Sequence, residues 1–105
     1  MLMTSSDNVP GREIEETIGL VTANAVRSRH IGRDILASFK NIIGGEIGAY
    51  TQLLRESREQ AFAELTATAE AEGADAIVGV RMATSAIASG AAEILVYGTA
   101  VRLAS

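Results

Sequence analysis

The chain has 105 residues, a formal net charge of −4 and no cysteine, which fits a single domain. Without cysteine, disulfides, thiolate metal sites, iron–sulfur clusters and a thiol nucleophile are excluded. Nine Lys and Arg face thirteen Asp and Glu, with no basic run. This argues against binding nucleic acid, because contacts to the phosphate backbone need a dense positive patch. The sequence shows neither a signal-peptide pattern nor a membrane-spanning apolar stretch, so we expect a cytoplasmic protein without a membrane partner.

The apolar residues are numerous but small. Hydrophobic residues make up 48% of the chain, whereas aromatic residues make up only 4%. An alanine buries much less apolar area than a leucine or phenylalanine, and burial stabilises by roughly 25 cal/mol per Å². Small domains with a limited core gain stability by burying surface against copies of themselves. We therefore expect a homo-oligomer.

The polar N-terminus predicts a flexible segment over residues 1–11. It ends in the turn signal Val9-Pro10-Gly11, because proline followed by glycine is typical of a turn. The remaining residues, 12–105, are expected to form one domain, since no second composition shift or internal repeat interrupts them.

Two helices are predicted in the middle of the chain. Residues 33–43 carry an apolar stripe at helical spacing, which Gly44-Gly45 ends. A longer helix is predicted over residues 46–72, where apolar residues recur at steps of three and four, and Gly73 ends it.

Three strands are predicted, over residues 13–26, 74–87 and 91–103, with a hairpin turn at Ala88-Ser89-Gly90. The period of two places Ile18 and Leu20 on one face, with Val21 and Ala23 on the other, and makes Val78 and Val80 share a face. Each strand contains an interior glycine, which predicts a bulge or the close approach of another element; these glycines are Gly19, Gly79 and Gly98.

These elements predict an α+β fold, with two helices packed on a three-stranded, mainly antiparallel sheet. The strands carry apolar residues on both faces, a pattern typical of sheets that are covered on both sides. Two helices can cover one face, so a neighbouring subunit is the simplest cover for the other.

Several runs of the sequence resemble the YbjQ-like family of small bacterial proteins. The specific runs are Gly44–Tyr50 and Gly73–Val80, supported by Gly32-Arg33-Asp34, Ala61-Phe62 and Tyr97–Val101, and the similarity spans residues 14–102. The resemblance implies a β-α-α-β-β subunit with an antiparallel sheet, assembled into a ring that is most often a homopentamer. The family carries a heavy-metal-binding label.

A ligand site is predicted around the paired glycines. Gly44 and Gly45 precede a helix, where exposed backbone N–H groups can hold an anion or a carbonyl oxygen. Alternatively, they only form the turn between the helices. Arg33 and Tyr50 flank this turn and would line a small-molecule pocket at a subunit junction; alternatively, Arg33 pairs with a carboxylate and Tyr50 packs its ring.

His30 and Asp34 are the candidate metal ligands, because they lie four residues apart. One histidine and one carboxylate are too few for a closed zinc site unless neighbouring subunits add ligands. Soft heavy metals prefer thiolate and thioether ligands, and the chain offers three methionines, Met1, Met3 and Met82, but no cysteine. As the sole histidine, His30 would also have to serve as the base of any nucleophilic triad, so the sequence favours a protein that is not an enzyme.

The sequence thus predicts a non-enzymatic oligomeric module, a ring with sites for a small ligand or a partner at its subunit junctions. The alternatives are a metal-binding or metal-responsive protein and a small enzyme. The predicted partner is the chain itself. No cofactor is predicted beyond the metal ion of the second hypothesis.

Overall fold

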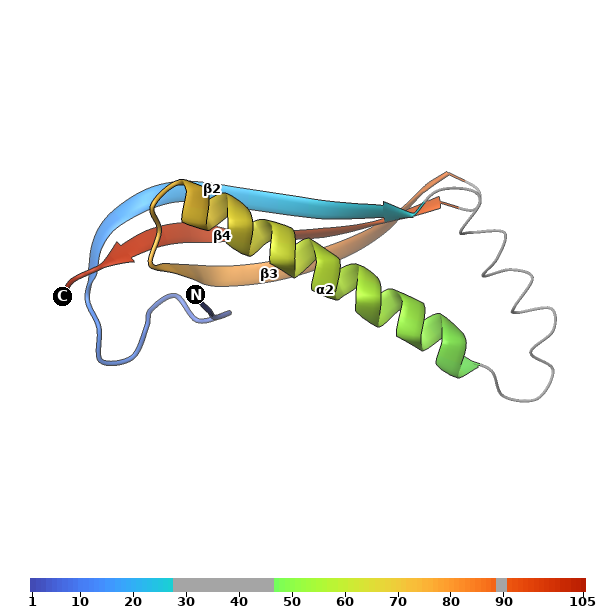
Figure 1. The fold of residues 1–105 in the computed structure, drawn as a ribbon, viewed down its shortest axis with the longest axis horizontal. Helices are drawn as coiled ribbons and strands as arrows, with labels where there is room; N and C mark the ends of the chain where they lie inside the picture. Colours follow the sequence, from blue (N-terminus) through green and yellow to red (C-terminus); the bar gives the residue numbers. More distant parts are fainter. Residues whose placement is uncertain (28–46, 89–90) are drawn as a thin grey trace.

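A computed structural model describes residues 1–27, 47–88 and 91–105, with side chains described for residues 1–25, 54–85 and 93–105. The described elements form one four-stranded sheet and one helix (Figure 1). In chain order they are β1 (Leu2–Met3), β2 (Ile14–Arg27), α2 (Ile47–Ala71), β3 (Ala76–Ala88) and β4 (Ala91–Leu103).

The sheet has the strand order β1-β3-β4-β2. The central strand β4 pairs antiparallel with both β2 and β3, and β1 pairs in parallel with β3. The α+β class and the mainly antiparallel sheet therefore agree with the sequence. The three long strands and α2 lie within two residues of their predicted bounds, whereas the predicted helix over residues 33–43 and its ending at Gly44-Gly45 lie outside the described residues.

The fourth strand corrects the predicted count of three. Leu2 and Met3 pair with Ala76 and Ile77 of β3, and the backbone continues this pairing as Val80 N–H donates to Thr4 O over 3.0 Å. The strand lies inside the segment of residues 1–11, whose flexibility stays a prediction. Two residues are too few to show the alternation by which a strand is recognised in sequence.

A β-bulge in β3 decides which side chains reach the helix. Between the partners Val78–Thr99 and Arg81–Tyr97, β3 contains one residue more than β4, and Gly79 in the bulge has a φ of 60°, a conformation that glycine adopts without steric cost. The extra residue turns Val80 toward α2, where it packs with the core, while Val78 packs in a cluster on the opposite face. The prediction that Val78 and Val80 share a face is therefore wrong.

A second irregularity has the same effect in β2. The register shifts between Thr17 and Gly19, and Gly19 has a φ of 144°. Ile18 consequently packs against the same core cluster as Val21, and Leu20 points to the other face with 71% of its surface exposed. The predicted pairing of Ile18 with Leu20 on one face is thus corrected, and the prediction that the interior glycines mark bulges is confirmed for Gly19 and Gly79.

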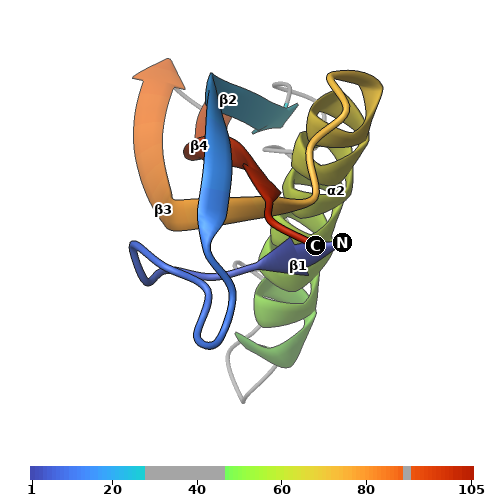
Figure 2. The same ribbon diagram turned by 90° about the vertical axis from the view of Figure 1, so that its left-hand side faces the viewer.

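The main core lies between α2 and one face of the sheet, which we call the helix face (Figure 2). The helix contributes Ala61, Leu65 and Ala69, spaced four residues apart and each 0% exposed, so one stripe of α2 faces the sheet. Because two of these three side chains are alanines, the helix can lie close to the strands. The sheet side of this core consists of Val21, Ala23, Ala25, Ile77, Val96 and Ala100.

The opposite face of the sheet, which we call the open face, is covered by described residues at only one end. There Val9, from the N-terminal segment, joins a second buried cluster with Ala76, Val78, Val101 and Leu103. At this end Asp75 also joins β3 to β4, because its N–H donates to Val101 O over 2.8 Å and its carboxylate accepts the N–H of Leu103 over 2.9 Å.

The chain is elongated, with extents of 54 × 24 × 17 Å. Its radius of gyration is 16.9 Å, against about 13 Å for a compact domain of 100 residues. The three long strands extend together away from the end at which both termini lie (Figure 1). An elongated sheet of this kind leaves apolar surface that a compact domain would bury.

Candidate functional site

A groove of about 260 Å³ opens on the helix face between β1, β3 and α2. Its lining is mostly apolar or neutral and comes from three parts of the chain: Met3, Thr4, Ser5, Phe62, Val80, Arg81 and Met82. Pockets for drug-sized ligands are commonly larger, about 300–1,000 Å³, and enclose most of the ligand. The size and the open shape suit one apolar side chain or a single ion.

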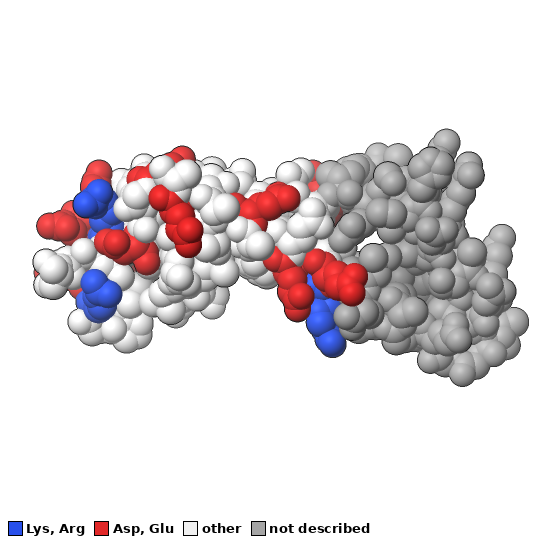
Figure 3. Space-filling model, viewed as in Figure 1, with Lys and Arg blue, Asp and Glu red and all other residues white. Residues whose placement is uncertain are grey.

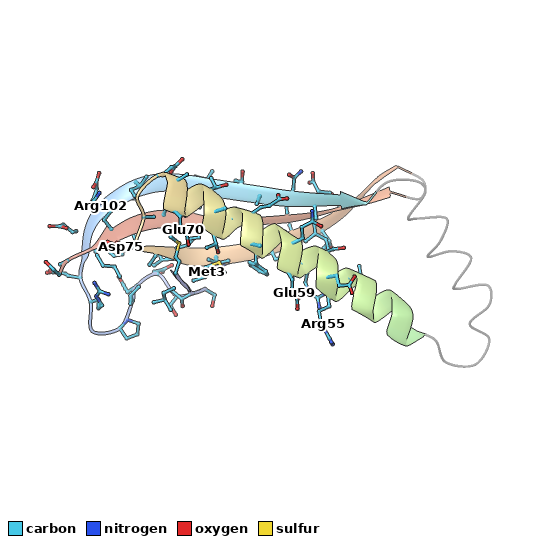
Figure 4. The ribbon with its side chains drawn as sticks, in the orientation of Figure 1. Met3, Arg55, Glu59, Glu70, Asp75 and Arg102 are labelled. Carbon is cyan, nitrogen blue, oxygen red and sulfur yellow. The ribbon has the colours of Figure 1, made fainter. Side chains whose placement is uncertain are left out.

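The bulge at Gly79 and the strand β1 together build this groove. The bulge directs Val80 into it, and β1 supplies Met3 along the edge of β3. The Met3 sulfur accepts a hydrogen bond from the Thr66 hydroxyl of α2 over 3.6 Å. Figure 4 shows Met3 reaching toward the helix, so β1 is tied to the strand beside it and to the helix above it.

Arg81 is the charged residue of the groove lining. Its guanidinium donates to Ser5 O over 2.8 Å and to Val80 O over 3.0 Å. These contacts hold the backbone at Ser5 against β3. Arg81 therefore closes the groove where the pairing of β1 with β3 stops.

The open face presents a second candidate surface. Cross-strand partners share a face, and the register pairs Leu20 with Thr99, Thr22 with Tyr97 and Ala83 with Leu95. Leu20 is 71% exposed, Thr22 and Ala83 are exposed, and Leu95 and Tyr97 are half-buried. This patch of apolar and neutral side chains continues the buried cluster around Val101 and has no covering element among the described residues.

Two charged residues border this patch, because the register pairs Arg81 with Tyr97 and Glu93 with Ser85. Figure 3 shows carboxylates along the outer side of α2 and at the end where the chain termini lie. Arg55 and Glu59 project from the flank of α2, one turn apart (Figure 4). At the sheet end, Arg102 and Glu16 form an ion pair at 3.6 Å between half-exposed side chains, a contact of small energetic weight.

The residues that the sequence singled out fall outside this description. Arg33, Gly44 and Gly45, together with the metal candidates His30 and Asp34, are not among the described residues, and Tyr50 is described only as a backbone position of α2. The ligand and metal sites predicted from them stay predictions. The groove was not predicted, because its residues come together only through β1 and the bulge. Of these two features, only the bulge has a signal in the sequence, which is Gly79 inside a predicted strand.

The described residues offer no cluster of three or more His, Asp or Glu side chains that could hold a metal ion. The thioethers of Met3 and Met82, which line one groove, are ligands of the kind that soft metals prefer. In the described ranges, no helix is long and apolar enough to cross a membrane.

Comparison with known proteins defines the class to which this sheet and helix belong. A solved structure from Pediococcus pentosaceus, a protein of unknown function of the DUF74 family, superposes with a TM-score of 0.65 and covers 99% of this chain and 98% of that chain. At 16% identity the similarity establishes a shared fold.

The chain belongs to the YbjQ family, described as "putative heavy-metal-binding", which matches residues 1–104. The match includes β1, so it extends beyond the range of residues 14–102 that the sequence runs indicated. A relative named UPF0145 protein in Photobacterium profundum is 56% identical over 98% of this chain and 100% of that protein. Another in Colwellia psychrerythraea is 52% identical over 98% of each chain. A 50% identical relative in Archaeoglobus fulgidus, with 98% and 95% covered, shows that the family extends to archaea as well as bacteria.

Proposed function

We propose that this protein is a non-enzymatic, homo-oligomeric module that assembles through the open face of its sheet. The observation that carries the proposal is Leu20, which is 71% exposed on the same face as the half-buried Tyr97 and Leu95. Burying a leucine side chain fully stabilises by about 1.5–3 kcal/mol. A copy of the chain that covers this patch would extend the core, which consists largely of alanine and valine, without any change in the fold.

The assembly is a ring in the cytoplasm, and the resemblance to the YbjQ-like family supplies the number five. Arg33, Gly44, Gly45 and Tyr50 would then meet at subunit junctions and gather sites for a small ligand or a protein partner. Neither nucleic acid nor a membrane is a partner in this proposal, because thirteen acidic residues outnumber nine basic ones and electrostatic binding to anionic surfaces requires the reverse.

The native mass tests the assembly. The chain has a mass of 11.0 kDa, so a pentamer is expected at about 55 kDa in native mass spectrometry of untagged protein purified without chelators. Replacing Leu20 by Glu is expected to weaken assembly by at least about tenfold in dissociation constant, because burying an unpaired carboxylate costs well over the 1.4 kcal/mol that corresponds to this factor.

A matched control is Ala67→Glu, which adds the same charge at an exposed position of α2. This variant is expected to keep the parent's mass, and both variants are expected to keep its circular dichroism spectrum. A parent protein that is monomeric at micromolar concentration would contradict the proposal. So would a Leu20→Glu variant that assembles as tightly as the Ala67→Glu control.

A soft-metal site is a second candidate function, favoured by the two thioethers in the groove. Met3 is half-buried and Met82 is 47% exposed, so a monovalent soft ion such as Cu⁺ or Ag⁺ can reach the groove from solvent. The lining contains no carboxylate that would favour a hard ion instead. This candidate uses a different part of the molecule from the open face.

Titration with Ag⁺ tests this second candidate. One ion per chain is expected, with at least about tenfold weaker binding in Met3→Leu and in Met82→Leu, because losing even an outer-shell partner of a metal typically costs 10–100-fold. Methionine to leucine conserves volume and is well tolerated in packed sites. Met1→Leu is the control and is expected to bind like the parent. Unchanged Ag⁺ binding in the double variant Met3→Leu, Met82→Leu would remove the groove from consideration.

A further inference from the structure

We propose that copies of this chain join head to tail, with the outer edge of β2 in one copy paired to the free edge of β3 in the next, so that the sheets form one continuous surface. The inference rests on the proposed function as an oligomer and specifies how the copies meet. The partner in this contact is a second copy of the same chain, because both of the paired edges belong to the sheet of this chain.

Both edges are free, over the length of β2 and over the second half of β3. The strand order places β2, with 14 residues, at one end of the sheet. At the other end β1 covers only the beginning of β3. The hydrogen bond from the N-terminal segment that lies furthest along β3 is the one that the Arg81 guanidinium donates to Ser5 O. Beyond it, residues 82–88 of β3 have no partner strand on this side among the described residues.

Outside their irregularities, between Thr17 and Gly19 in β2 and between Ala86 and Ala88 in β3, the free edges lack the features by which monomeric proteins often protect an exposed strand. Natural edge strands usually contain charged side chains or proline, or are very short, because a row of unpaired backbone N–H and C=O groups pairs with other chains. Residues 17–26 of β2 and residues 82–88 of β3 contain neither a charged residue nor a proline. The charges of β2 stand outside this stretch, at Glu15 and Glu16 on one side and Arg27 on the other.

Pairing of these edges also joins the open faces. Thr22 and Ser85 lie near the middle of the two free stretches, and their register partners Tyr97 and Glu93 place both on the open face. Leu20 would thus lie beside the open-face residues of the next copy's β3, including Ala83. The same contact would then pair the free backbone groups of both edges and give Leu20 an apolar neighbour from the next copy.

The two edges lie on opposite sides of one sheet, and this decides the symmetry. Pairing β2 with β2 would give a two-fold dimer and leave both β3 edges free. Pairing β2 with β3 is heterologous, and such a contact repeats until a ring closes. Every copy then uses both edges, so a closed ring has no free edge of this kind. In such a ring α2 lies on the same side of the continuous sheet in every copy, either outside or inside.

Cysteine crosslinking tests this arrangement without background, because the chain has no cysteine. Thr22→Cys and Ser85→Cys are combined in one chain and treated with a bismaleimide shorter than three strand spacings. In the proposed order two Thr22 positions of adjacent copies lie three strands, about 14 Å, apart. The double variant is expected to give a ladder of covalent species that ends at the number of copies in the native mass, whereas each single variant gives none.

The controls separate the edge pairing from its alternatives. The pair Asn24→Cys with Ser85→Cys covers a pairing register that is shifted by two residues. The pair Thr68→Cys with Ser85→Cys is expected to give no ladder, because Thr68 lies on the exposed side of α2. Efficient crosslinking of Thr22→Cys alone would overturn the inference in favour of a two-fold dimer. An oligomeric native mass with no ladder from either pair would overturn the edge pairing and leave the proposed oligomer standing. A monomeric mass would overturn both.

Discussion

Replacing Gly98 by alanine is expected to destabilise the protein by about 1–3 kcal/mol, the usual cost of adding a methyl group to a filled core. Gly98 is a buried residue of β4. A Cβ atom at this position would lie 2.7 Å from Cγ2 of Ile77, 3.1 Å from Cγ2 of Val80 and 3.1 Å from the backbone oxygen of Val78. The first distance is too short for two carbon atoms, so β3 or β4 must move.

The reason for this crowding is the bulge on the neighbouring strand. Between Val78 and Arg81, β3 places its extra residue opposite Gly98, and both Ile77 and Val80 point to the helix face there. Only a residue without a side chain leaves room for both. Gly98 is thus the close-approach glycine that the sequence predicted, and its requirement follows from the conformation of Gly79.

Urea unfolding at one fixed protein concentration checks this prediction, since the stability of an oligomer depends on concentration. The neighbouring Thr99→Ala, on the open face, is the control and is expected to cost less. Combining Gly98→Ala with Ile77→Ala should cost less than the sum of the two single changes, because the methyl group that the new Cβ meets is gone. A Gly98→Ala variant as stable as the parent would mean that the bulge does not pack over β4 as described.

The bounds of the long elements were predictable because each has a strong local signal. In β4, observed at Ala91–Leu103, a β-branched and aromatic run follows the turn signal Ala88-Ser89-Gly90 in the sequence. In α2, observed at Ile47–Ala71, apolar residues recur at helical spacing over too many turns to be a chance pattern, and Gly73 follows the end of the helix. Such patterns depend on neighbouring residues alone, which is why the sequence indicates them without knowledge of the fold.

The distribution of side chains between the two faces was harder to predict. The glycines Gly19 and Gly79 signalled bulges, but a bulge inserts one residue, and each insertion turns all later side chains of that strand to the other face. Counting by twos through Gly19 therefore placed Ile18 with Leu20, and through Gly79 it placed Val78 with Val80. Neither β1 nor the groove has a local signal, because both depend on the contact of the first residues with residues more than 70 positions away.

Replacing Leu65 by alanine is expected to have the largest effect of the changes considered, about 2–5 kcal/mol of unfolding free energy. Leu65 is 0% exposed and is the largest of the three side chains by which α2 contacts the helix face. Its neighbours at the same spacing, Ala61 and Ala69, are too short to fill the volume that its loss would leave. The size of the cost depends on how far the surrounding strands can collapse into that space.

The exposed position Thr68 on the same helix supplies the control, because Thr68→Ala is expected to change stability by less than about 0.5 kcal/mol. Leu65→Met, which conserves volume, is expected to cost less than about 1.5 kcal/mol. Denaturant unfolding followed by circular dichroism measures all three variants. A cost for Leu65→Ala close to that of Thr68→Ala would show that α2 does not rest on the sheet through this stripe. In that case the groove, whose wall includes Phe62 one turn earlier on α2, would lose its support as well.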